Sequence, residues 1–396
     1  LAATDRLLVF RDNDDVLGAG DGATVTVCDG ENLTGLDLYQ NYVIARHDNG
    51  SNPSVADFFE AHDPIVDADI PYTATAGLDV SDNFALYIPA GTIFQPLDLV
   101  DVGTAGTSSD LVVDGQLDLG GTTTVFGDIS GTGTLNVGTQ SVDAAAGITV
   151  ASLDGGSGSV TVGGLWSPGS FTPSTGSVTF DGTGDIPTET FYTLVINTAG
   201  TVTATGPITV TNGITLTSGT FDPGSYSHSV AGNWNNTGVT FQPTSGEIIL
   251  TGSGPSINQW PGNNFYDLTL TDGASLSAAL TVDNDLTISG TLTGNSNQIT
   301  VSGNWTNNGT YTAGAAGEVI FTDTSKTPQN SGATTFQDMK VTLTAGAGAN
   351  GKVLSLEAGV TQTVAGLLTL TGDKDILFGD IVYVYLTSSS PGAQAS

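Results

Sequence analysis

Three copies of one unit of about 70 residues constrain the fold of this chain more than any other feature. Each copy carries a tryptophan in a run rich in Gly, Asn and Thr, and these residues, Trp166, Trp234 and Trp305, lie 68 and 71 positions apart. A second marker, FYTLVI, FYDLTL or FQDMKV, begins at Phe191, Phe265 and Phe336. Because both markers recur in the same order at a nearly constant step, they predict an array of related structural units.

Inside each unit the side chains alternate with a period of two. In the run GEVIF, Val319 and Phe321 fall on one face and Ile320 falls on the other. Thr, Val and Ile are abundant, and Gly, Asn, Asp or Ser interrupts each short apolar run. These patterns are typical of short β-strands separated by turns, so we predict an all-β protein.

Two all-β architectures are consistent with a unit of this length. Each unit can form about three coils of a parallel β-helix, with roughly 23 residues in each coil. Alternatively, each unit can form a small antiparallel β-sandwich. The turns lack a regular Asn-Gly or Asp-Gly hairpin signature, so we predict the β-helix and keep tandem β-sandwich domains as the alternative.

The repeat also resembles a known group of proteins. The string SGNWTNNGTYTAGAAGEVIF, at residues 302–321, is followed by a Phe-x-x-Met strand. This pattern is similar to repeats in large secreted bacterial β-solenoid surface proteins, such as filamentous haemagglutinin and the passenger regions of autotransporter adhesins. The resemblance covers about residues 111–378. It implies a solenoid fold and a cell-surface setting, but it does not imply a particular chemistry.

The charge composition argues against several classes of partner. The chain has 40 acidic and 7 basic residues, and no Lys or Arg lies between Arg46 and Lys326. A nucleic-acid binder needs basic residues to neutralise phosphates, so we expect no nucleic-acid partner. There is no run of 18 apolar residues, and we therefore predict no membrane span. The single cysteine, Cys28, excludes an intrachain disulfide framework.

The two ends of the chain differ from the repeats in their sequence pattern. We predict an N-terminal mixed-β domain at residues 1–107, solenoid repeats at 108–375, and a C-terminal apolar strand and tail at 376–396. The N-terminal domain contains a candidate helix over residues 54–62, with Ser54 as its N-cap and Asp57 in its first turn.

The C-terminal strand is apolar on both faces. Its residues are Ile381, Val382, Tyr383, Val384, Tyr385 and Leu386. Such a strand needs cover on two sides, either as the buried last strand of the solenoid or as a strand that pairs with another subunit. The second alternative makes these residues an assembly strand that adds to the edge of a neighbouring copy.

One acidic loop is a candidate metal site. Clustered carboxylates in a loop with glycines suit Ca²⁺, and the residues concerned are Asp12, Asp14, Asp15 and Asp21. The alternative is a solvated acidic turn, because the spacing is not that of an EF-hand loop. No other cofactor is expected.

Catalytic and sugar-binding patterns are weak. The three histidines show no metal-ligand spacing, so we expect no catalytic residues and no enzyme activity. The tryptophans Trp166, Trp234 and Trp305 are interpreted as packing residues of the repeat, with a sugar-binding ladder as the alternative.

Together these features suggest a structural role outside the cell. The leading hypothesis is a subunit of an extracellular filament or surface layer that binds copies of itself head to tail, through the N-terminal domain and the C-terminal strand. The alternative is a cell-surface adhesin or stalk that binds glycans. A β-helix enzyme acting on polysaccharides is the least favoured hypothesis.

Overall fold

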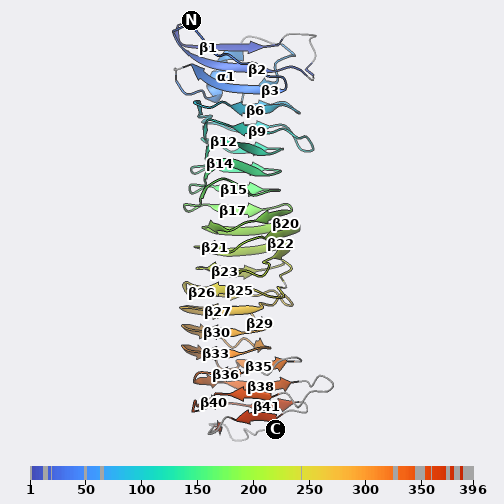
Figure 1. The fold of residues 1–396 in the computed structure, drawn as a ribbon, viewed down its shortest axis with the longest axis vertical. Coiled ribbons are helices and arrows are strands. Elements are labelled where there is room, and N and C mark those ends of the chain that lie inside the picture. The colour runs from blue at the N-terminus through green and yellow to red at the C-terminus, as the bar shows by residue number, and fades with distance from the viewer. Residues whose placement is uncertain are drawn as a thin grey trace. The chain divides into compact units, whose positions relative to one another are not determined.

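The computed structural model describes residues 2–11, 17–18, 20–48, 51–62, 67–241, 243–323, 329–343, 353–357, 359–371, 375–378 and 384–386. The chain divides into an N-terminal unit, Leu1–Pro187, and a C-terminal unit, Thr188–Ser396. In both units the described strands pair almost entirely in parallel and stack as the rungs of a β-solenoid (Figure 1). The predicted all-β class and parallel β-helix are therefore confirmed, and the sandwich alternative is wrong.

The N-terminal unit contains two sheets. Sheet I consists of β1 (Ala3–Phe10), β2 (Ala23–Asp29), β3 (Tyr42–Asp48), β6 (Ala85–Ile88), β7 (Ile93–Phe94), β9 (Leu111–Val113), β10 (Gln116–Asp118), β12 (Ile129–Asn136), β14 (Ile148–Asp154) and β16 (Phe171–Thr172). Sheet II consists of β4 (Tyr72–Thr73), β5 (Leu78–Val80), β8 (Val100–Val102), β11 (Thr123–Val125), β13 (Ser141–Ala144), β15 (Ser159–Val162) and β17 (Ser177–Phe180). Strand β18 (Gly184–Ile186) follows in sequence.

The register of sheet II separates an apolar interior from a polar surface. The inward-facing residues Val80, Val102, Val125, Ala144, Val162 and Phe180 form one column of register partners. All of them are buried, because the period-two alternation places them on the same side of every strand. This ladder already pairs β5 with β8 and β8 with β11, so the predicted domain boundary at residue 107 falls within it.

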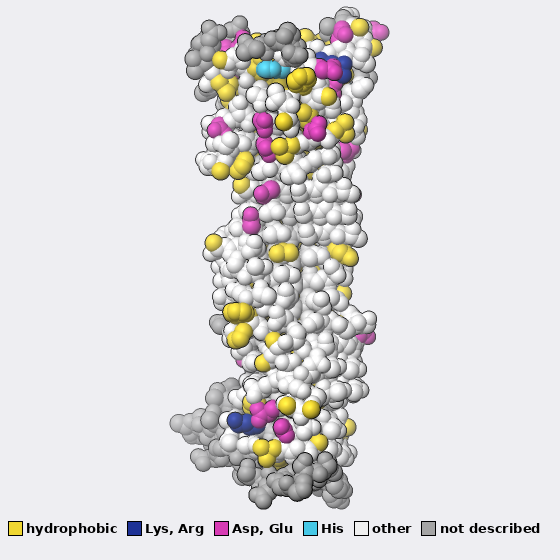
Figure 2. All heavy atoms as spheres, turned by 180° about the vertical axis from the view of Figure 1, so that it is seen from behind, with side chains coloured by type: hydrophobic (Ala, Val, Ile, Leu, Met, Phe, Trp, Pro, Cys, Tyr) yellow, Lys and Arg dark blue, Asp and Glu magenta, His cyan; other side chains and the backbone are white. Residues whose placement is uncertain are grey.

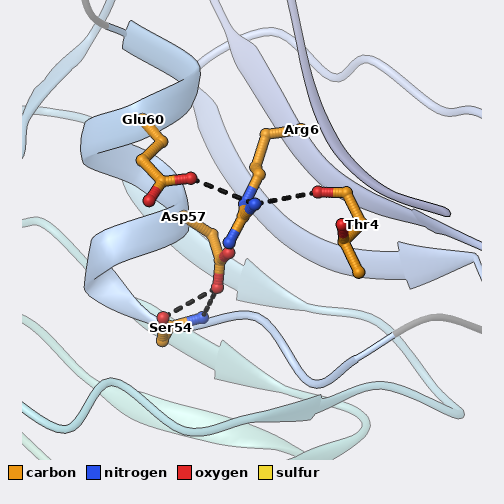
Figure 3. A network of polar contacts seen from close by, with 5 residues as sticks. All are labelled: Thr4, Arg6, Ser54, Asp57 and Glu60. Atoms are coloured by element: carbon orange, nitrogen blue, oxygen red, sulfur yellow. Dashed lines mark hydrogen bonds and ion pairs between the residues drawn. The ribbon is translucent and has the colours of Figure 1, made fainter. Parts of the chain in front are cut away.

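The N-terminal unit begins with a helix-supported cap. Strand β1 is antiparallel to β2, whereas β2, β3 and β6 pair in parallel. Helix α1 (Val55–His62) confirms the predicted helix, and the Asp57 carboxylate accepts hydrogen bonds from the backbone and hydroxyl of Ser54, at 2.8 and 2.7 Å. Arg6 joins β1 to α1 through ion pairs with Asp57 (2.7 Å) and Glu60 (3.0 Å), as Figure 3 shows.

The C-terminal unit contains four sheets. Sheet III consists of β20 (Thr193–Ala204), β22 (Ile214–Asp222), β24 (Trp234–Asn236), β26 (Ser253–Asn258), β28 (Gly273–Leu276), β31 (Thr291–Thr293) and β34 (Thr310–Thr312). Sheet IV consists of β19 (Glu189–Phe191), β21 (Ile208–Val210), β23 (Ser227–Val230), β25 (Glu247–Leu250), β27 (Asp267–Leu270), β30 (Leu286–Ile288), β33 (Trp305–Asn307), β36 (Gln329–Ser331), β39 (Val353–Leu356) and β42 (Asp375–Phe378). Sheet V consists of β29 (Leu280–Val282), β32 (Ile299–Val301), β35 (Glu318–Asp323), β38 (Asp338–Leu343) and β41 (Leu368–Thr371). Sheet VI consists of β37 (Thr334–Phe336), β40 (Gln362–Val364) and β43 (Val384–Leu386).

The sequence repeat and the structural coil differ in length. In the C-terminal unit the number of residues between register partners on neighbouring coils varies. Leu268 pairs with Leu286, which makes a short coil, whereas Met339 pairs with Leu368, which makes a long one. The common step is that from Leu250 to Leu270, so one copy of the sequence repeat extends beyond three coils. Equivalent segments consequently fall on different faces. Trp234 lies in sheet III and Trp305 in sheet IV, while the equivalent runs EIIL and EVIF lie in sheets IV and V.

Candidate functional site

The three repeat tryptophans lie inside the solenoid. Trp166 and Trp305 are 0% exposed and Trp234 is 1% exposed. Trp234 packs against Phe265 with ring centroids 5.0 Å apart, and Trp305 packs against Phe336 at 5.5 Å. The two markers of the repeat therefore contact each other within one copy. Because no indole surface is exposed at these positions, the alternative of a sugar-binding ladder is wrong for these three residues.

The fourth tryptophan, Trp260, has no place in the repeat and was not singled out by sequence reasoning. Its side chain is 49% exposed. It follows β26, in which burial alternates, so that Ile257 and Gln259 point inward while Ser256 and Asn258 reach the surface. Trp260 continues the outward set. Its position outside the repeat period is the sequence signal that could have identified it, because packing residues of a repeat recur and this one does not.

Buried amides hold the backbone on both sides of Trp260. The Gln259 side chain donates Nε2 hydrogen bonds to the carbonyl oxygens of Asn263 (2.9 Å) and Thr281 (3.0 Å), and its Oε1 accepts from the Thr281 backbone (2.6 Å). The Asn263 backbone N–H donates to the Trp260 carbonyl at 3.1 Å, and the Asn263 Oδ1 accepts from the Phe241 backbone at 2.7 Å. Buried and paired amides of this kind fix the backbone of the loop that carries the exposed indole.

A polar groove lies on the outer face of sheet III, and its lining includes Ser256 and Asn258 of β26, the strand that precedes Trp260 in the chain. Its volume is about 360 Å³. Its polar lining is formed by Thr193, Asn212, Asn233, Asn235, Ser256, Asn258 and Ser277, with Thr215. None of these side chains is charged. Asn258 donates to the Asn235 Oδ1 at 2.8 Å, which leaves the Nδ2 group of Asn235 and the Oδ1 of Asn258 unpaired among the described residues.

A larger groove, of about 1030 Å³, lies in the N-terminal unit and is acidic. Asp79 and Asp101 line it as register partners on β5 and β8, and Asp82 lies nearby. Hydroxyl groups hold two of these carboxylates, since Thr73 donates to Asp79 at 3.3 Å and Thr104 donates to Asp82 at 2.8 Å. Figure 2 shows several acidic side chains over the N-terminal unit on the face that it draws.

The predicted calcium loop is described only in part. Asp12, Asp14 and Asp15 lie outside the described residues. Asp21 is buried, its Oδ2 accepts from the Gly18 backbone at 2.6 Å, and its Oδ1 has no partner among the described residues. In the part of the chain that the structure describes, no group of three or more His, Cys, Asp or Glu side chains is arranged to hold a metal ion. Calcium binding stays a prediction.

The predicted assembly strand is also described in part. Ile381, Val382 and Tyr383 lie outside the described residues, whereas Val384, Tyr385 and Leu386 form β43. This strand pairs in parallel with β40 of sheet VI, in the register Gln362 to Val384. The segment therefore continues the coil ladder of the C-terminal unit.

One buried histidine has a defined role in packing. His228 lies on β23 and is 3% exposed. Its Nδ1 accepts from the Ile208 backbone at 3.1 Å, and its Nε2 lies 2.8 Å from the Pro223 carbonyl oxygen, to which it donates in the neutral tautomer. Burial lowers the pKa of His228, and the Pro223 contact partly offsets that effect. The ring links neighbouring coils in its neutral form.

Comparisons with protein families, with curated proteins and with solved structures found no match to this chain. Among the described residues, no helix combines the length and the apolar character that crossing a membrane would require. The architecture itself is clear: the chain is a β-solenoid repeat protein.

Proposed function

We propose that this protein is a structural subunit of an extracellular filament or surface layer that assembles from copies of itself. One observation carries the proposal. Three sheets of the C-terminal unit end in the same last coil, at β41, β42 and β43. Each of these strands pairs on one side only among the described residues. Unpaired strand edges are templates for the addition of strands from another chain.

The start of the N-terminal unit offers a different surface. Strand β1 is antiparallel, its register with β2 shifts between Ala3 and Arg6, and Thr4 has a positive φ of 74°. The bulge and the charged side chain of Arg6 discourage another strand from pairing with this first part of β1. Residues 7–10 of β1 keep a regular register with β2, and half-buried Leu7 and Phe10 lie there. We propose this part of β1 as the other side of the joint.

The charge of the chain sets the conditions for assembly. A net charge of −33 makes copies repel one another, so assembly should increase as salt or calcium screens the charge. The resemblance of the repeat to those of secreted surface proteins supports an extracellular setting.

Electron microscopy and sedimentation velocity test the proposal. The full chain should form filaments or sheets at high concentration in about 0.15 M salt, where the Debye length is short. A variant truncated after residue 374, which lacks β42 and β43 and instead exposes the edges of β39 and β40, should form fewer polymers than the full chain. If the full chain remains monomeric with salt and calcium, or if truncation leaves polymers unchanged, the proposal fails.

A second candidate function, glycan binding, is favoured by a separate observation. This observation is the exposed Trp260, which follows Ser256 and Asn258 of the uncharged groove along the chain. It does not depend on assembly.

A further inference from the structure

We infer that Trp260 and the polar groove on sheet III form a binding site for a neutral oligosaccharide. The inference begins from the contrast among the four tryptophans. Three have at most 1% of their surface exposed, whereas Trp260 has 49% exposed. A large aromatic surface in water is unfavourable, and an exposed indole on an ordered loop marks a place where a ligand can cover it.

The loop that carries Trp260 is preorganised. Gln259 and Asn263 are 5% and 7% exposed, and their side chains form hydrogen bonds with the backbone of this loop and of neighbouring coils. Pro261 fixes one backbone angle, and Gly262 takes a φ of 80°, which closes the turn. A loop that is already ordered loses little backbone entropy when a ligand binds, so more of the interaction energy appears as affinity.

The chemistry of the adjoining groove selects the ligand class. Its polar groups are amides and hydroxyls, which both donate and accept hydrogen bonds, and none carries a charge. A sugar ring has the matching pattern, with hydroxyls around its rim and an apolar C–H face that stacks on an indole. Acidic ligands are disfavoured, because the groove holds no basic side chain and the chain carries a net charge of −33.

A peptide is a poorer match for this surface. Strand β24, in the groove, is paired on both sides, with β22 and with β26, so its backbone cannot accept an added strand. Ser256, Asn258 and Trp260 instead form an outward row, two residues apart along β26 and the loop that follows. Successive members of such a row are separated by about 7 Å. An extended saccharide chain can lie along this row and contact the amides and the indole together.

Titration with neutral hexasaccharides tests the inference on the full chain. The probes are cellohexaose, maltohexaose, mannohexaose and hexa-N-acetylchitohexaose, with an oligogalacturonate as the acidic comparator. Acrylamide quenching of tryptophan fluorescence reports Trp260, because the other three indoles are buried. We expect saturable binding of at least one neutral probe, protection from quenching, and no comparable binding of the acidic probe.

Two variants and a control locate the site. Trp260→Ala should weaken binding by at least about tenfold, as loss of an aromatic anchor does. Asn258→Ala should weaken it by a smaller factor. Leu367→Ala, which removes another exposed apolar side chain of the same unit, should leave affinity unchanged. Circular dichroism establishes that each variant is folded.

Three results would overturn the inference: no neutral probe binds at millimolar concentration, Trp260→Ala binds as tightly as the parent chain, or the acidic probe binds as tightly as a neutral one. Assembly provides an independent readout. Trp260→Ala should form the same polymers as the parent chain, so failure of the sugar site and failure of the filament proposal are distinguishable.

Discussion

The two units share one coil architecture but distribute charge differently. Residues 1–187 hold 26 of the 40 acidic residues, and residues 188–396 hold 14. In sheet II the outward column of register partners contains Asp79, Asp101 and Asp143. In sheet IV an outward column of register partners contains Thr269, Thr287 and Thr306. The interior determines the fold in both units, and the outward residues are left to set solubility and binding.

The units also differ in how their sheets end. The N-terminal unit ends at an antiparallel strand with a bulge, tied to a helix by Arg6. The C-terminal unit ends at three parallel strands whose outer edges are unpaired among the described residues. The bulge discourages the addition of a strand at the start of β1, so only its regular part at residues 7–10 is available for pairing, whereas the three C-terminal strands are open along their described lengths.

The largest effect should come from the aromatic clusters of the interior. Trp234→Ala removes an indole packed against Phe241 and Phe265, at 4.9 and 5.0 Å, and should lower the free energy of unfolding by about 3–5 kcal/mol. Hydrogen exchange should show the loss in the C-terminal unit. The matched variant Trp166→Ala should act on the N-terminal unit instead. Equal loss of protection in both units from either variant would show that the chain unfolds as one cooperative body.

Much of this interior could be predicted from sequence. The alternation of Val, Ile and Phe with Thr and Ser predicts which residues point inward, because the period of a strand is two. The sheet in which each repeated segment lies could not be predicted, because the number of residues in a coil depends on turns that range from tight bends to long loops. The unequal steps from Leu268 to Leu286 and from Met339 to Leu368 illustrate this.

The candidate sugar site was less accessible to sequence reasoning. Trp234 belongs to a recurring motif, and in a solenoid a recurring aromatic residue indicates packing. Trp260 has no counterpart in the other repeats. It lies on a loop fixed by the side chains of Gln259 and Asn263, and nothing in the sequence marks these two residues as structural. Amide hydrogen bonds between coils depend on which residues become neighbours, and only the register defines those neighbours.

A smaller effect should come from the cap of the N-terminal unit. Arg6→Ala removes a charge-assisted hydrogen bond to Asp57, which is largely buried, and an ion pair with the more exposed Glu60. We expect a loss of about 1–2 kcal/mol. Hydrogen exchange should show it in β1 and α1. Arg11→Ala, which removes another arginine of the same unit that lies outside this network, is the control, and similar losses from both variants would contradict a specific role for Arg6.

The buried histidine of the C-terminal unit, His228, should make the free energy of unfolding depend on pH. The pKa of His228 is lower in the folded chain than in the unfolded chain, so the unfolded state binds more protons as pH falls. Its contribution to stability is complete above the ordinary pKa near 6.5 and is lost as pH falls below that value. His228→Gln should therefore show a flatter stability profile between pH 7 and pH 5, measured by denaturant unfolding. Parallel profiles of the two chains would contradict this role.

The smallest effect should come from the acidic outer face of the N-terminal unit. Burial raises the pKa of Asp143, and repulsion from Asp181 raises it further. The folded chain therefore binds a proton more readily than the unfolded chain, and the charged carboxylate costs stability at neutral pH. Asp143→Asn should raise stability at pH 7 by no more than about 1 kcal/mol, since the group is half-buried and screened. The gain should shrink as pH falls and Asp143 becomes protonated. Thr161→Val, at the next outward position of the same column, is a control for packing, and its effect should not vary with pH. A gain from Asp143→Asn that stays constant down to acidic pH would show that packing, and not charge, limits the stability of this face.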